Sequence, residues 1–216
     1  MNTTSSTFTK TFFMTFCICA IISCKEKDNG ARMIITGVRD ITLPNKEAEN
    51  DFNKGLFYVR HGNYSAAKDF FMRADEESPN TPIILNAVGN SLDRCGEAPE
   101  GFKYYKNALR IDSNYIETYV NYGASLNNIA RFDEAEAIFR LGLRKKSSSS
   151  FDRSRLYFNL AYSYNALGQW DSALSVLDSA KIGLKDQNIL DGIKQMENHV
   201  KMSALTGDGV DTDGRK

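Results

Sequence analysis

Small and large side chains recur along this chain at a step of about 34 residues. Gly62, Gly96 and Ala130 follow one another at that step, and Gly168 comes after the same step with four residues inserted beside the serines of 147–150. Other positions keep both the step and the insertion: Ala67, Gly101, Ala135 and Ala173; Ala74, Ala108, Gly142 and Ala180; Phe71, Tyr105, Phe139 and Leu177; and Tyr58, Leu92, Leu126 and Tyr164. Because independent series share one period, the chain is predicted to repeat one structural unit four times.

Each unit is predicted to contain two short amphipathic helices. In the first unit, Tyr58 lies on the first helix, and Ala67, Phe71 and Ala74 follow at steps of four and three on one face of the second. We expect small residues where the two helices cross, because a large side chain there would push the backbones apart, and an aromatic residue between successive units. The stretch 100–216 contains no proline, the strongest helix breaker, so a mostly helical protein is favoured.

This pattern resembles the tetratricopeptide repeat family over most of the chain, from 48 to 187. The most literal copies run from Asn121 to Ala135 and from Asn159 to Ala173. The resemblance implies an all-α solenoid, a right-handed superhelix of four helix-turn-helix repeats at 48–81, 82–115, 116–149 and 154–187. One departure is that charged residues, Asp51 and Lys54, stand where large apolar residues are usual, which suits an outward-facing first helix.

The segments on either side of the repeats have different expected roles. A repeat array needs a cap over its last apolar face, and 188–205 is predicted to be that helix, because Ile189, Ile193, Met196 and Val200 form one stripe. The tail 206–216, rich in glycine and aspartate, is expected to be disordered. Residues 24–47 are interpreted as a tether, and its apolar side chains between 33 and 43 either pack on the first repeat or meet a partner.

The segment 1–23 is predicted to be an export signal. The apolar run 12–22 follows Lys10; it is too short to span a bilayer, which needs about 20 residues, but it has the length of the apolar region of a signal peptide. The sequence Ile-Ile-Ser-Cys at 21–24 resembles the lipobox of bacterial lipoproteins. That resemblance implies a lipidated Cys24 and a place in the bacterial cell envelope, with Lys25 favouring the outer membrane. The alternative is an ordinary signal peptide or a short anchor.

Composition and motifs argue against several function classes. Lys plus Arg total 27 and Asp plus Glu total 27, so the chain lacks the positive charge that holds nucleic acid. His61 and His199 are far apart with no neighbouring Cys or His, so no metal site is expected and both are interpreted as solvated residues near helix ends. No phosphate-binding loop and no paired nucleophile and base occur, so we expect neither an enzyme nor a cofactor. After export and lipidation, Cys95 would be the one remaining thiol.

The family resemblance implies a concave groove formed by the first helix of each repeat. The repeat frame assigns these side chains to a predicted partner-binding groove: Phe52, Leu56, Asn86, Asn90, Asp93, Asn121, Asn128, Arg155, Asn159, Tyr162 and Asn165. Asparagine both donates and accepts hydrogen bonds, so a row of amides can pair with the backbone of an extended peptide. The alternative is that Asn53, Asn121 and Asn159 hold the helix packing.

Together these features predict a membrane-tethered scaffold or adaptor that binds a peptide segment or a partner protein at the cell envelope. A more specific form is an assembly factor resembling the repeat-containing lipoprotein pilotins, which escort an outer-membrane complex. A carbohydrate-binding lipoprotein is another alternative, because Tyr162 and the amides could hold a sugar, although Trp170 is expected in a turn packed between helices. An enzyme of unrecognised type is the third.

Overall fold

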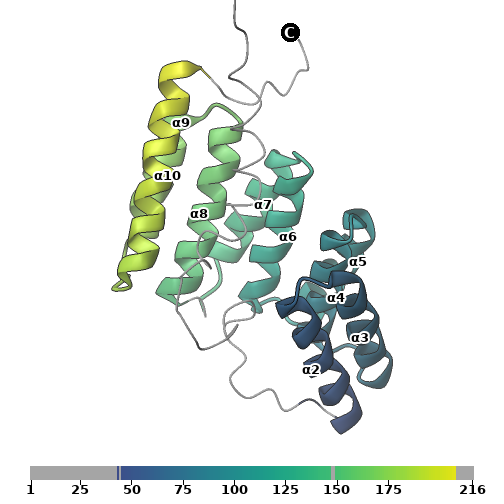
Figure 1. The fold of residues 1–216 in the computed structure, drawn as a ribbon. Coiled ribbons are helices and arrows are strands. Elements are labelled where there is room, and N and C mark those ends of the chain that lie inside the picture. The colour runs from purple at the N-terminus through teal and green to yellow at the C-terminus, as the bar shows by residue number, and fades with distance from the viewer. Residues whose placement is uncertain (1–42, 44, 147–148, 208–216) are drawn as a thin grey trace, which may run out of the picture. The chain divides into compact units, whose positions relative to one another are not determined.

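The computed structural model describes residue 43 and residues 45–146 and 149–207. Within these ranges the chain is helical and forms no strand (Figure 1). The helices are α2 (Lys46–Arg60), α3 (Tyr64–Glu77), α4 (Pro82–Arg94), α5 (Ala98–Ile111), α6 (Ile116–Asn128), α7 (Phe132–Leu143), α8 (Ser150–Ala166), α9 (Trp170–Ala180) and α10 (Gln187–Thr206). The prediction of an all-α fold is therefore confirmed.

The helices belong to two compact units. The N-terminal unit holds α2 to α5, α6 as far as Ser125, and residues 145 and 146; the C-terminal unit holds α6 from Leu126, α7, α8, α9 and α10. Along the sequence the helices come in pairs, one pair in each predicted repeat. Two first helices start earlier than the predicted repeat boundaries, α2 by two residues at Lys46 and α8 by four at Ser150.

Backbone conformation explains why small residues recur at the turn inside each repeat. Gly62, Gly96 and Gly168 have φ angles of 72°, 84° and 71°, and Ala130 at the same place in the third repeat has a φ of 60°. This left-handed conformation is open to glycine, whereas it costs an L-residue with a Cβ roughly 1–2 kcal/mol. The turn therefore selects glycine, and Ala130 occupies it under strain.

The two helices of a repeat approach closely where the sequence predicted small residues. A Cβ on Gly101, a member of the predicted small series, would stand 2.8 Å from the carbonyl oxygen of Gly89, and a Cβ on Gly89 would stand 2.8 Å from Cε1 of Tyr105. The side chains of the small series are buried at the crossings: Ala67, Ala135 and Ala173 each have 0% exposure. The expected role of these residues is therefore confirmed.

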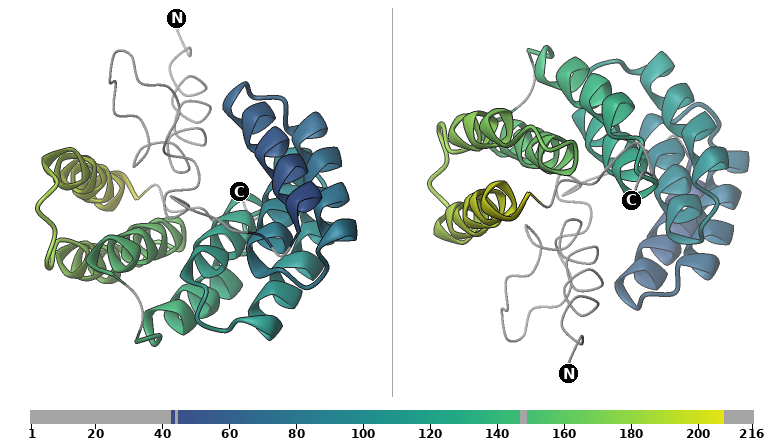
Figure 2. Two further views of the ribbon diagram at one scale, coloured as in Figure 1. Left: turned by 90° about the horizontal axis from the view of Figure 1, so that it is seen from below. Right: turned by 90° about the horizontal axis from the view of Figure 1, so that it is seen from above.

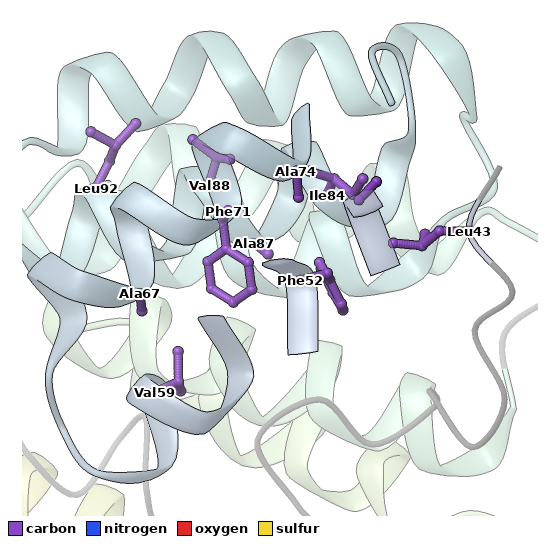
Figure 3. Packing of buried hydrophobic residues seen from close by; sticks show 11 residues of the cluster. Leu43, Phe52, Val59, Ala67, Phe71, Ala74, Ile84, Ala87, Val88 and Leu92 are labelled. Carbon is purple, nitrogen blue, oxygen red and sulfur yellow. The ribbon is translucent and has the colours of Figure 1, made fainter. Parts of the chain in front are cut away.

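An apolar cluster joins the first repeat to α4. Figure 3 shows the Phe71 ring beside Ala67 and Val59, and the rings of Phe52 and Phe71 lie 5.2 Å apart between centroids. The buried members are Leu43, Ala48, Phe52, Val59, Ala67, Phe71, Ala74, Ile84, Ala87, Val88 and Leu92. Full burial of a large apolar side chain contributes about 1.5–3 kcal/mol. Leu43 is the one described member of the apolar tether residues, and it packs on this first repeat.

Charged residues form ion pairs on the outer side of the first repeat. Asp51 and Lys54 take the places that Leu85 and Val88 occupy one repeat later. Lys54 Nζ lies 2.9 Å from Asp51 Oδ1, and Arg73 Nε lies 3.2 Å from Asp51 Oδ2. Lys54 is exposed as predicted. The Asp51 side chain is only 11% exposed, and its charge is balanced by the two neighbouring cations.

The last helix has the features of a cap. In Figure 2, α10 lies beside α8, and α10 also contacts α9. Its stripe of Ile189, Ile193, Met196 and Val200 is 9% exposed or less, as the spacing predicted. Lys181, just after α9, pairs with Glu197 of α10, and Gly207 ends the helix with a φ of 71°.

Several predicted features fall outside the described residues. They are the signal peptide at 1–23, the lipidation site Cys24, the tether 24–47 except for Leu43 and 45–47, and the tail 206–216 from residue 208 onward.

Candidate functional site

In the N-terminal unit the first helices of successive repeats touch. α2 and α4 share the apolar cluster described above, and the side-chain amide of Asn121 on α6 donates to the side-chain oxygen of Asn86 on α4 at 3.1 Å. The half-buried side chains on these three helices form what we call the first-helix face: Leu56, Asn90, Asp93, Glu117, Asn121 and Ala124. Of these, Leu56, Asn90, Asp93 and Asn121 were among the predicted groove residues.

Two predicted groove residues of this unit are not available to a ligand. Phe52 has 1% exposure because its ring packs on Phe71 in the core, so its assignment to the groove is wrong. Asn86 has 2% exposure, and its side-chain oxygen accepts from Asn121. The repeat period placed both residues on the correct helices. It did not predict that their side chains are buried, because burial depends on how closely the neighbouring helix approaches.

In the C-terminal unit the predicted residues divide in the same way. Asn128, Arg155 and Tyr162 are half-buried, with the Arg155 guanidinium 5.6 Å from the ring centre of Phe151. Two asparagines are buried: Asn159, at 8% exposure, and Asn165, at 7%. The side chain of Asn159 donates to the carbonyl oxygen of Arg155 at 2.8 Å. The Asn159 side chain is therefore used within α8, and neither buried asparagine can line a groove.

Sequence reasoning missed a buried hydrogen-bond network in this unit. Asn127 donates from its side-chain amide to the carbonyl oxygen of Asn159 at 3.2 Å, and the hydroxyl of Ser163 donates to the Asn127 side-chain oxygen at 2.8 Å. The network joins the end of α6 to α8. The recurrence of Asn127 as Asn165, one repeat later, was the available sequence signal.

The charges on α4 and α6 are mainly negative. These two helices, both described throughout, contain three charged side chains: Asp93, Arg94 and Glu117. Arg94 is turned toward α3, where its guanidinium lies 4.4 Å from the ring centre of Tyr64 and donates to the Tyr64 hydroxyl at 3.0 Å. Asp93 and Glu117 are the half-buried charged side chains that α4 and α6 contribute to the first-helix face.

A buried hydroxyl lies close to these carboxylates. Tyr105 of α5 has 0% exposure, and within the described structure its hydroxyl oxygen has no hydrogen-bond partner. Burial raises the pKa of the Tyr105 hydroxyl well above its usual value, and the charges of Asp93 and Glu117 raise it further. The nearby side chain of Asn90 opposes this rise in pKa only in part. The hydroxyl therefore stays neutral at ordinary pH.

The described residues contain no cluster of three or more His, Cys, Asp or Glu side chains that could hold a metal ion. None of the helices in the described ranges has the length and apolar composition needed to cross a bilayer. Of the two histidines, His61 is exposed at the end of α2, whereas His199 is half-buried within α10, so the interpretation of His199 as a solvated helix-end residue is wrong.

Stacked helix pairs with small residues at the crossings define a helical repeat protein. Residues 52–81 match the family model of the tetratricopeptide repeat, and the chain has the all-α tetratricopeptide repeat fold.

Known proteins share this fold at low sequence identity. MamA from Desulfovibrio magneticus RS-1 is 16% identical, with a TM-score of 0.59 over 78% of this chain and 89% of that one. The structure described as the functional characterisation of Pseudomonas aeruginosa pilF is 19% identical, with a TM-score of 0.59 over 76% and 77%. A probable UDP-N-acetylglucosamine–peptide N-acetylglucosaminyltransferase SPINDLY of Hordeum vulgare is 28% identical over 88 residues, 38% of this chain. The chain spans 9% of that relative's length.

Proposed function

We propose that this chain is a non-catalytic scaffold that binds an extended segment of a partner protein on its first helices. The observation that carries the proposal is the contrast on α4 and α6. Asn86 is buried in an amide pair, while Asn90, Asp93 and Glu117 remain half-buried at the surface. Repeats that use some amides for packing and keep other polar side chains at the surface can bind a backbone without rearranging their core.

The scaffold is further proposed to be tethered by lipid on Cys24 to the bacterial cell envelope, at the outer membrane. The support is the signal-like segment 1–23 and the four residues that end at Cys24. Two or more acyl chains anchor a protein stably, since each buried CH2 contributes about 0.8 kcal/mol. Cys24→Ser should abolish incorporation of labelled palmitate and release the protein from membranes. Equal labelling of the variant would contradict the tether.

Partner binding is tested by capture from an envelope extract. Asn90→Ala and Tyr162→Ala each truncate one half-buried side chain, in the N-terminal and C-terminal units respectively. Lys106→Ala, an exposed residue on the second helix α5, is the matched control. We expect the control to recover the same partners as the wild type and the two variants together to lose them. Equal recovery by all proteins would reject the half-buried side chains of the first helices as the binding surface.

A finer form of the proposal is a pilotin-like role, in which the scaffold escorts a component of an outer-membrane complex. The support is the sequence that ends at Cys24, which resembles a lipobox, together with the repeat fold. Deletion of the protein should then leave one pore-forming membrane protein in the wrong membrane, as fractionation would show. Correct location of every outer-membrane protein would exclude this role while leaving the scaffold proposal intact.

A further inference from the structure

The chain that leads into α2 is fixed close to the first turns of α2 and α4. Leu43 is 6% exposed and belongs to the apolar cluster together with Ala48 of α2 and Ile84 of α4, each the third residue of its helix. Figure 3 shows Leu43 at one end of that cluster. The side-chain amide of Asn45 donates to the backbone carbonyl oxygen of Glu77 at 2.6 Å. The residues that precede Leu43 therefore start from a defined place beside the two first helices.

The surface beside this place combines apolar and amide side chains. Leu56 of α2 and Ile83 of α4 are half-buried, and both pack against the cluster that holds Leu43. Asn53 is exposed and precedes Leu56 by three residues, so the two lie on one side of α2. An amide both donates and accepts hydrogen bonds, so Asn53 can pair with the backbone of an extended chain. The two helices therefore offer apolar contacts and a polar group to a neighbouring segment.

The ten residues before Leu43 have the composition of an extended apolar segment. Residues 33–42 are Met-Ile-Ile-Thr-Gly-Val-Arg-Asp-Ile-Thr, and six of them are β-branched, which favours extended backbone. Side chains alternate along an extended chain, so Ile41 would be directed to the same side as the buried Leu43. At about 3.3 Å per residue the segment can reach about 33 Å, whereas the 15 residues of α2 span about 22 Å. The segment is therefore long enough to cover the whole of α2.

We infer that residues 33–42 bind along α2 and α4 of their own N-terminal unit, with apolar side chains over Leu56 and Ile83 and the backbone paired with Asn53. The covalent link through Leu43 holds the segment at an effective concentration of about a millimolar, so weak contacts suffice to dock it. A partner segment that binds the same helices must displace it. This competition rests on the proposed scaffold function, whereas the docking itself does not.

Methyl-group NMR of the full chain without residues 1–23 tests the docking. We expect nuclear Overhauser cross-peaks that join the methyl groups of Ile41 or Val38 to those of Leu56 or Ile83. Replacing both Val38 and Ile41 by serine should abolish the docking and shift the Leu56 and Ile83 signals. Phe57→Ala is the matched control, because Phe57 follows Leu56, is 49% exposed and lies on another side of α2; it should leave the cross-peaks unchanged.

Three results would overturn the docking. The first is the absence of these cross-peaks in the wild type. The second is transfer from Ile41 to the ring of Phe57 in place of Leu56, which would put the segment on the wrong side of α2. The third is loss of the cross-peaks when labelled chains are mixed with an excess of unlabelled chains, which would make a second copy the occupant.

The envelope capture described above tests the competition. The Val38→Ser and Ile41→Ser double variant should recover severalfold more partner than the wild type, because the free surface is then more populated. Asn29→Ser, in the tether but outside 33–42, is the control and should change nothing. Cross-peaks with unchanged capture would leave the docking standing and the competition wrong. Absent cross-peaks with capture that still depends on Asn90 and Tyr162 would refute this inference and leave the scaffold function standing. If that capture is also insensitive, both fail.

Discussion

Asn121 of α6 donates a side-chain hydrogen bond to the side-chain oxygen of Asn86 of α4, with the nitrogen 3.1 Å from the oxygen. Asn86 is 2% exposed, so this pair belongs to the packing between the first helices of successive repeats. Asn127 and Ser163 join α6 to α8 in the C-terminal unit. Part of the asparagine series therefore holds helices together, and only the remainder can serve a ligand.

Breaking this pair should destabilise the fold. Asn121→Ala leaves the buried oxygen of Asn86 without its partner, which should lower the free energy of unfolding by about 1–3 kcal/mol. Urea unfolding followed by circular dichroism measures the change. Asn107→Ala on α5, whose amide oxygen accepts from the exposed Arg110, should cost less than about 0.5 kcal/mol. Equal effects of the two substitutions would show that the Asn86 contact contributes nothing.

Gly89→Ala should overpack the crossing between α4 and α5. The new Cβ would stand 2.8 Å from Cε1 of Tyr105 and 3.1 Å from the carbonyl oxygen of Gly101, so one helix must shift, at a cost of about 1–3 kcal/mol. A double-mutant cycle with Tyr105→Leu tests the cause. The second substitution should absorb part of the loss, and strict additivity would mean that the ring is not what Gly89 accommodates.

Ala130→Gly should stabilise the protein. Ala130 has a φ of 60° at an exposed turn, and relief of this strain outweighs the greater freedom of glycine in the unfolded chain by roughly 0.5–1 kcal/mol. Thermal unfolding should show a higher midpoint. The same change at the buried helical Ala135 should lower it, because that position has no strain to relieve and loses contacts. A lower midpoint for Ala130→Gly would contradict the left-handed turn.

His199 should make stability depend on pH. Burial lowers the pKa of this imidazole below its ordinary value of 6.5. Above that value the side chain is neutral in both folded and unfolded chains and contributes no pH dependence. As the pH falls through 6.5, the unfolded chain binds a proton more readily, so stability decreases until the folded pKa is reached.

Substitution of each histidine checks this assignment. The thermal midpoint should fall less between neutral and mildly acidic pH for His199→Gln than for the wild type. His61→Gln is the control, because His61 is exposed and the chain has only these two histidines. An unchanged pH profile for His199→Gln would place the responsible group elsewhere.

The candidate site was predictable in part. The repeat frame found Leu56, Asn90, Asp93 and Asn121 on the first helices, because a helix period assigns side chains to a stripe. It could not separate Asn90 from Asn86, one turn away on the same stripe, since their difference in burial comes from the neighbouring helix. It also could not find Tyr105, a second-helix residue whose buried hydroxyl has no hydrogen-bond partner within the described structure.

The amino-acid order alone determined the repeat, the two helices in each unit and the small residues at the turns and crossings. These features follow from local geometry: the constant repeat period, the left-handed turn and the space available between two crossing helices. Tertiary structure alone decided which amides pair internally and which stay at the surface, as Asn86 and Asn90 show. That outcome depends on how far apart neighbouring helices lie and how they are aligned, which distant residues set together and no local pattern records.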